Sequence, residues 1–142
     1  METQELHRGR LIDHLQLVVR DLAASRKFYG AILPPLGVPI GGDGEDYFWA
    51  DELFVSTADS SAAQGQLTGR HHLAFQAKDR AAVDAFYKTA LANGGKDNGA
   101  PGERPYHPGY YAAFVLDPDG NNIEAVFHGE AQRSAESVKV TF

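Results

Sequence analysis

Three positions in this sequence carry residue types that bind divalent transition metals. His14 and His72 lie 58 residues apart, and Glu124 is a lone carboxylate in the apolar run 123–127. Two imidazoles and one carboxylate form a common ligand set for Fe, Mn, Ni, Co or Zn, and they leave coordination positions open for a substrate. A carboxylate in an apolar strand also costs free energy unless it is paired or coordinated. We therefore expect one divalent metal ion, with Glu124 as both ligand and catalytic residue.

The two histidines occupy equivalent places in an internal repeat. Residues 14–37 and 72–95 align without a gap at a constant offset of 58, and nine of the 24 positions are identical. The matched pairs include Asp21 with Asp79, Phe28 with Phe86, Tyr29 with Tyr87, Leu33 with Leu91, and Gly37 with Gly95. A repeat of this length predicts two copies of one structural unit. A pseudo-twofold relation between the copies would bring His14 and His72 together.

Each copy predicts one strand, one helix and about three further strands. The first strands are 15–19 and 73–77, and the later ones are 47–50, 53–58, 110–116 and 122–127, with a DPDG turn at 117–120. Asp21 and Asp79 stand where helix N-caps belong, and glycines at 37 and 94–95 are plausible stops. The helical spacing predicts that Ala24, Phe28, Leu33, Ala82, Phe86 and Leu91 face the sheet.

These elements predict an α+β fold of two tandem βαβββ modules, with a curved mixed sheet and the helices on its outer face. The first module spans 11–59 and the second 70–128, joined by a small, polar linker at 60–69. Residues 1–10 and 129–142 are expected to be tails on one compact domain. Within the second tail, Val138–Phe142 is expected to add an edge strand or contact a neighbour.

Strand alternation predicts which side chains line the concave face. If Leu15 and Leu17 pack beneath the helices, His14 and Gln16 face the other way, and the same parity applies to the second copy. His128 shares the face of Glu124 but lies farther along its strand. The residues expected to line a substrate site are Gln16, Trp49, Phe54, Gln76, Arg104, His107, Tyr110 and Phe114. Among them, Arg104 is a candidate partner for an anionic group.

Three motifs carry a resemblance to a known superfamily. DHLQLVV at 13–19, HHLAFQA at 71–77 and DPDGNNIEAV at 117–126, together with the two FY pairs, resemble the vicinal oxygen chelate superfamily over about residues 11–128. That superfamily includes glyoxalase I, fosfomycin-resistance proteins, extradiol dioxygenases and bleomycin-resistance proteins. The resemblance implies paired βαβββ modules that form a cup around a divalent metal, with ligands at the positions of His14, His72 and Glu124.

The resemblance also limits the reaction. Glyoxalase I-like isomerases use a fourth ligand, a carboxylate, at the position that matches Phe54. Phenylalanine cannot coordinate a metal, so we do not expect a lactoylglutathione lyase reaction. The main hypothesis is a metal-dependent enzyme that acts as a Lewis acid on a small oxygen-chelating substrate, as a lyase, isomerase, thiol transferase or dioxygenase. The alternatives are a non-enzymatic binding protein of the bleomycin-resistance type, and a degenerate domain with a structural metal.

Composition narrows the partners and the location. The net charge of −6 and 13 scattered basic residues argue against nucleic acid, and no apolar run approaches the roughly 20 residues of a membrane span. The sequence contains no cysteine, so it offers neither a disulfide framework nor a thiolate metal site. The first ten residues lack the apolar stretch of a signal peptide. We expect a cytoplasmic protein with a small-molecule ligand, and the resemblance implies a homodimer.

Overall fold

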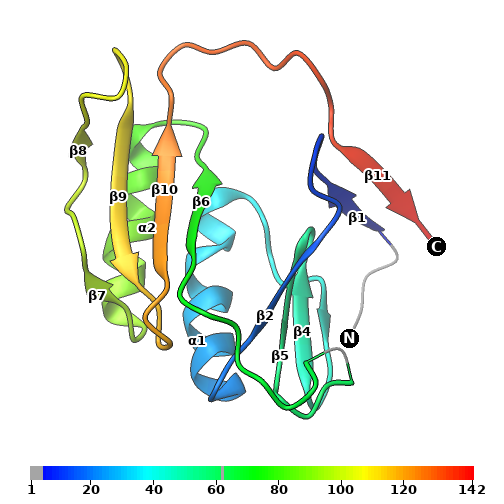
Figure 1. Ribbon diagram of the computed structural model, residues 1–142. Helices are drawn as coiled ribbons and strands as arrows, with labels where there is room; N and C mark the ends of the chain where they lie inside the picture. The colour runs from blue at the N-terminus through cyan, green and yellow to red at the C-terminus, as the bar shows by residue number, and fades with distance from the viewer. Residues whose placement is uncertain (1–4, 62) are drawn as a thin grey trace.

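A computed structural model describes residues 5–61 and 63–142. Two modules of the same design follow one another along the chain (Figure 1). The first contains β2 (Leu15–Val18), α1 (Leu22–Ile32), a 3₁₀ turn (Pro34–Leu36), β3 (Gly42–Asp43), β4 (Tyr47–Ala50) and β5 (Leu53–Ser56). The second contains β6 (His72–Gln76), α2 (Arg80–Ala92), β7 (Lys96–Asp97), β8 (Gly102–Glu103), β9 (Tyr111–Leu116) and β10 (Asn122–Phe127). The predicted α+β fold of two βαβββ modules is confirmed.

The two sheets repeat one topology. The first has the order β2-β5-β4-β3, and the second has the order β6-β10-β9-β7 with β8 also on β9. In each sheet the first strand runs parallel to the last strand of its module, and the other pairs are antiparallel. Among the described residues no strand of one sheet pairs with a strand of the other. Instead, Thr68 of the linker hydrogen-bonds to the backbone of Val18, along the free edge of β2.

Both helices begin at the predicted N-caps. The carboxylate of Asp21 accepts a hydrogen bond from the backbone of Ala24 at 3.1 Å, and Asp79 does the same for Ala82 at 2.8 Å. This cap satisfies one of the backbone donors that the first turn of a helix leaves unpaired. The helices lie side by side behind the sheets and bury Phe28 and Phe86 completely between the layers (Figure 1).

One predicted core position is wrong. Leu91 is 41% exposed, whereas the neighbouring Ala90 is fully buried. Ala90 lies four residues after Phe86, which is the closer match to a helical period, so it takes the inward face near the end of α2. On α1, Ile32 lies four residues after Phe28 and is likewise buried.

A buried hydrogen bond joins the two modules. Tyr29 of α1 donates from its hydroxyl to Asp117 Oδ2 at 2.5 Å, and both residues are buried. Asp117 opens the DPDG turn between β9 and β10, where its carboxylate also accepts from the backbones of Asp119 and Asn121. Burial, and then the charge of Asp117, raise the pKa of Tyr29 well above its usual value. The predicted turn is therefore also the place where the first module is tied to the second.

The two ends of the described chain pair with each other. β1 (Glu5–Arg8) and β11 (Val138–Thr141) form a two-stranded antiparallel ribbon beside the first module (Figure 1). The edge strand expected near the C-terminus is present, but its partner is the segment that sequence analysis left as a tail. The exposed segment 129–137 arches from β10 to this ribbon. In the part of the chain that is described, no helix has the length and apolar character needed to cross a bilayer.

We predict that Tyr29→Phe destabilises the protein by about 1–3 kcal/mol, because it leaves a buried carboxylate oxygen short of a donor. Urea unfolding measures this change. The matched control is Tyr87→Phe, since Tyr87 occupies the equivalent repeat position but is only partly buried; its effect should stay below about 0.5 kcal/mol. Equal losses in the two variants would contradict the link between the modules.

The same contact predicts a pH dependence. A raised pKa in the folded state means that the contribution of Tyr29 is complete below about pH 10, where unfolded tyrosine titrates, and is lost as pH rises above that value. The stability difference between wild type and Tyr29→Phe should therefore shrink between pH 9 and pH 11.

Candidate metal centre

Glu124 is a buried carboxylate in the middle of the second sheet. Its exposed fraction is 2%, and each oxygen has one partner. His72 Nε2 lies 3.0 Å from Oε1, and the Tyr110 hydroxyl donates to Oε2. Glu124 lies opposite Ala74 of β6 and Phe114 of β9, so the strands that flank β10 supply its surroundings. A buried carboxylate that is paired on both oxygens indicates a built site, since its desolvation would otherwise be costly.

The hydrogen bonds of His72 define where its protons can lie. Its Nδ1 is 3.1 Å from the carbonyl oxygen of Asn122, so Nδ1 carries a hydrogen and donates. In a neutral ring, Nε2 then presents a lone pair to the carboxylate of Glu124. Two lone pairs at 3.0 Å repel, so the space between Nε2 and Oε1 suits a positive charge such as a metal cation. Metal-bound histidines are commonly oriented in the same way, because the ring nitrogen that does not bind the metal donates a hydrogen bond to a carbonyl.

The spacing of this pair fits a metal. Ligand distances of about 2.0–2.2 Å place two neighbouring ligand atoms about 3 Å apart, close to the separation of His72 Nε2 and Glu124 Oε1. The third predicted ligand is elsewhere: among residues 5–61 and 63–142, no three His, Cys, Asp or Glu side chains form a group that could hold a metal. One chain thus brings together two of the three predicted ligands.

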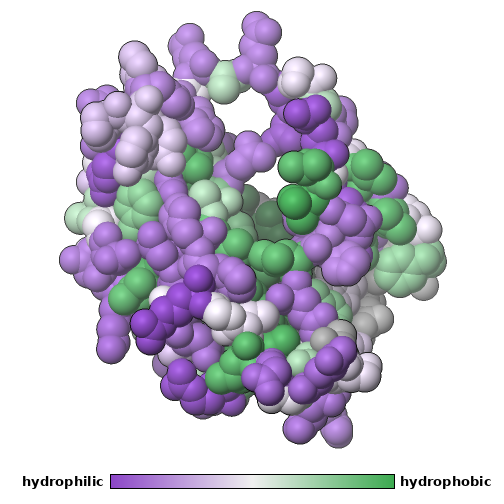
Figure 2. Space-filling view, in the orientation of Figure 1, coloured by the Kyte–Doolittle hydropathy of each residue, from purple (hydrophilic) through white to green (hydrophobic). Residues whose placement is uncertain are grey.

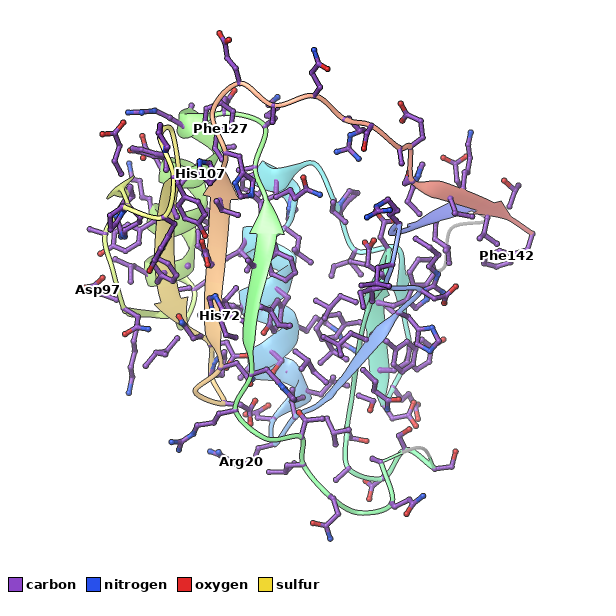
Figure 3. The ribbon with its side chains drawn as sticks, turned by 45° about the horizontal axis from the view of Figure 1, so that its top comes forward. Arg20, His72, Asp97, His107, Phe127 and Phe142 are labelled. Atoms are coloured by element: carbon purple, nitrogen blue, oxygen red, sulfur yellow. The ribbon has the colours of Figure 1, made fainter. Side chains whose placement is uncertain are left out.

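His14 lies just before β2, on the first module. Its Nδ1 is 2.6 Å from Asp13 Oδ1, and its side chain is 61% exposed. It lines a pocket of about 230 Å³ together with Leu6, Arg8, Trp49, Asp51, Phe54 and Phe142. In Figure 3, His72 lies on β6 while Phe142 lies beside the other sheet. The two histidines therefore line different halves of the cup.

Trp49 and Phe54 form the apolar wall of the His14 pocket. They lie opposite each other on β4 and β5, and Phe54 stacks on Tyr47 with ring centroids 5.4 Å apart. The indole of Trp49 lies directly over Gly41 and Gly42, where an added Cβ would come within 2.4 and 2.0 Å of it. Because β5 matches β10, Phe54 occupies the place equivalent to Glu124: Leu53 lies opposite Leu15 as Ile123 lies opposite Leu73. The first module therefore has an aromatic side chain where the second module has a carboxylate.

The two predicted glutamines are in different environments. Gln16 is partly buried and donates from Nε2 to Ser56 Oγ at 2.9 Å, within the first sheet. Gln76 is exposed at the end of β6 and lines a larger cavity, of about 440 Å³, under the arch of residues 129–137. Figure 2 shows hydrophobic residues in the hollow between the two halves and an opening beneath the arch. The quasi-symmetric pair therefore does not converge on one point.

Tyr110 and two histidines form an aromatic cluster beside Glu124. The rings of His107 and His128 each lie 5.3 Å from the Tyr110 ring, edge to face. His107 Nδ1 donates a hydrogen bond to the carbonyl of Pro108, and His107 Nε2 lies 2.9 Å from His128 Nδ1. Burial, and then the hydrogen bond to Glu124, raise the pKa of Tyr110 to about 12. The phenol therefore stays protonated at neutral pH and holds the carboxylate by donating to it.

Arg104 and Phe114 complete the second half of the site. Phe114 lies 5.9 Å from the His72 ring, nearly parallel to it, and the Arg104 guanidinium lies 5.4 Å from the Phe114 centroid. Seven of the predicted positions thus fall on this half: His72, Gln76, Arg104, His107, Tyr110, Phe114 and Glu124. The other four, His14, Gln16, Trp49 and Phe54, fall on the first half.

The comparisons with known proteins identify the family. Residues 11–125 match the model of the Glyoxalase/Bleomycin resistance protein/Dioxygenase superfamily. The chain belongs to this superfamily, the vicinal oxygen chelate superfamily. A curated relative, the uncharacterized protein YqjT of Bacillus subtilis, is 30% identical over 132 residues, which cover 80% of this chain and 95% of YqjT. The predicted recognition is therefore confirmed, and superfamily members bind small molecules.

Solved structures of the superfamily share the fold. A glyoxalase/bleomycin resistance protein from Albidiferax ferrireducens is 31% identical, with a TM-score of 0.71 over 82% of this chain and 98% of that one. A lactoylglutathione lyase from Agrobacterium tumefaciens is 20% identical, with a TM-score of 0.59 over 83% of this chain and 93% of that one. The second likeness concerns the fold alone.

Sequence reasoning missed several residues around the site. Leu6, Arg8, Asp51 and Phe142 line the His14 pocket, and His128 joins His107. The terminal residues are there because β1 and β11 pair across the whole length of the chain, which no local pattern signals. The strand-like residues Val138–Phe142 at the end of the sequence were the only signal that this segment packs against the rest of the protein.

We predict that Phe142→Ala increases the exposure of Trp49, because Phe142 lies in the same pocket. Trp49 is the only tryptophan, so its fluorescence reports on this pocket alone. The emission should shift to longer wavelength and acrylamide should quench it more strongly. Val138→Ala, on the same ribbon but 56% exposed and outside the pocket, is the matched control. Unchanged emission in Phe142→Ala would show that the ribbon does not cover this wall.

Proposed function

We propose that this protein is a divalent-metal-dependent enzyme that acts on a small, oxygen-chelating substrate. The observation that carries the proposal is the His72–Glu124 pair. Its two potential ligand atoms, His72 Nε2 and Glu124 Oε1, are 3.0 Å apart, and the Asn122 carbonyl orients the His72 ring. A bound divalent ion would act as a Lewis acid on a substrate oxygen. The open face of His72, 50% exposed, leaves room for a small molecule.

The residues of this chain would serve distinct purposes. His72 and Glu124 hold the ion, and Tyr110 fixes the second oxygen of Glu124 so that Oε1 stays aimed at His72. With its high pKa, Tyr110 remains a donor throughout the physiological range. Phe114 packs against the His72 ring and supplies an apolar surface beside the pair. Glu124 is also the candidate for moving a proton, although a metal-bound carboxylate is a weaker base.

We predict about one equivalent of a transition metal per chain in protein purified without chelator, measured by mass spectrometry. His72→Ala and Glu124→Gln should abolish binding, and Tyr110→Phe should weaken it about 10–100-fold. His71→Ala is the matched control, since His71 directly precedes β6 and contacts Asn121 and Asn122 through its backbone. No metal in wild type, even after reconstitution with Fe(II), Mn(II), Ni(II) and Zn(II), would leave a binding protein of the bleomycin-resistance type.

We further propose that His14 completes the site from a second copy of the chain. This proposal follows from the separation of His14 from the His72–Glu124 pair within one chain. Each site of a homodimer would then take two ligands from one protomer and His14 from its partner.

Mixed dimers test this arrangement. His14→Ala and His72→Ala chains carry different affinity tags, are co-expressed and are purified through both tags. A shared site predicts no metal in either parent and one equivalent per mixed dimer, because one of the two sites regains all three ligands. Metal-free mixed dimers would show that His14 acts within its own chain.

A further inference from the structure

Arg104 holds its guanidinium in a preformed slot at the edge of the second sheet. Its Nη2 donates to the carbonyl of Ala100 at 2.8 Å. A Cβ at Gly99 would come within 3.3 Å of Nη2, and one at Gly102 would come within 3.1 Å of Nη1. The absence of side chains at both glycines therefore makes space for the guanidinium. Its plane is held by backbone contacts and by the Phe114 ring.

This guanidinium is available to an anion. Several arginines of the described residues are neutralised by ion pairs, such as Arg80 with Glu103 at 2.7 Å and Arg26 with Asp43 at 2.6 Å. Arg104 bonds instead to two backbone carbonyls and stands within ion-pair distance of no described carboxylate. A guanidinium has five N–H donors, so the remaining ones suit a bidentate oxyanion.

The position of Arg104 relative to the proposed metal centre follows from the sheet order. β10 with Glu124 and then β6 with His72 lie on one side of β9, and the segment that carries Arg104 follows β8 on the other side. Both His72 and Arg104 contact the ring of Phe114, at 5.9 and 5.4 Å. A small molecule beside Phe114 would therefore meet a carboxylate–imidazole pair at one end and a cation at the other.

We propose that the substrate is a small organic carboxylate with a flat apolar body, and that Arg104 binds its carboxylate and determines this specificity. The proposal rests on the proposed function, because the other end of the substrate is the part presented to His72 and Glu124. The net charge of −6 does not attract anions, so a fixed local cation such as Arg104 would have to supply that attraction. Oxygen donors at the far end of the molecule complete the substrate class.

The test compares binding of 4-hydroxybenzoate and 3,4-dihydroxybenzoate with binding of their neutral amides, 4-hydroxybenzamide and 3,4-dihydroxybenzamide, by calorimetric titration of the full chain. Wild type should bind each carboxylate about tenfold more tightly than its amide, or better. Arg104→Gln should abolish that preference, and Arg104→Lys should keep part of it, because a purely structural arginine would show no such dependence on charge. Lys27→Gln, an exposed lysine on the outer helix α1, is the control for loss of one positive charge and should keep the full preference.

Metal content measured on the same samples separates the two proposals. Arg104→Gln should retain the metal content of wild type, because Arg104 is not a ligand. If wild type shows no preference for carboxylates, or if Arg104→Gln keeps it, the assignment of Arg104 is overturned whatever the metal content. If metal is absent but the preference depends on Arg104, the anion site stands and the proposed metal chemistry fails.

Discussion

The buried hydrogen bond from Tyr29 to Asp117 is the constraint on which the arrangement of the site depends. It ties the helix of the first module to the turn that begins β10. The Asp117 carboxylate also fixes this turn, because it accepts hydrogen bonds from two backbone amides and from the side-chain amide of Asn121. From that turn, the register of β10 with β6 and β9 places Glu124 opposite Ala74 and Phe114, with its carboxylate beside His72.

The two modules share a topology but divide the chemistry between them. At equivalent positions the first module carries Phe54 and the second carries Glu124. The first half of the cup is consequently a pocket with an aromatic wall, bordered by His14, Arg8 and Asp51, and the second half holds the buried carboxylate and the aromatic cluster. An internal repeat makes such a division possible, since one fold supplies two similar faces whose side chains can differ. The proposed substrate follows this asymmetry, with its polar ends on the second module.

Sequence alone predicted the parts of the fold that depend on local or periodic signals. The repeat gave both modules, Asp21 and Asp79 cap their helices, and the DPDG motif forms its turn. The pairing of His72 with Glu124 was accessible for the same reason, because both lie in strongly patterned strands. Leu91 was misplaced because Ala90 fits the helical period better, and a small residue gives a weak hydrophobic signal.

Long-range contacts account for what the sequence did not predict. The pairing of β1 with β11 joins the two ends of the described chain. Tyr29 is fully buried against the distant turn at Asp117, whereas its repeat partner Tyr87 is only partly buried and hydrogen-bonds to Asp97. His14 was expected beside His72 from pseudo-symmetry. The two sheets are separate, however, and each histidine lies with the sheet of its own module. Symmetry of sequence predicts equivalent positions within modules, but the packing between modules decides whether those positions meet.

Anomalous diffraction from crystals grown with Co(II) would locate a metal bound by His72 and Glu124. We predict a single strong anomalous peak within about 2.0–2.2 Å of both His72 Nε2 and Glu124 Oε1. A peak at the His107–His128 pair instead, or none between His72 and Glu124, would show that this pair does not bind a metal.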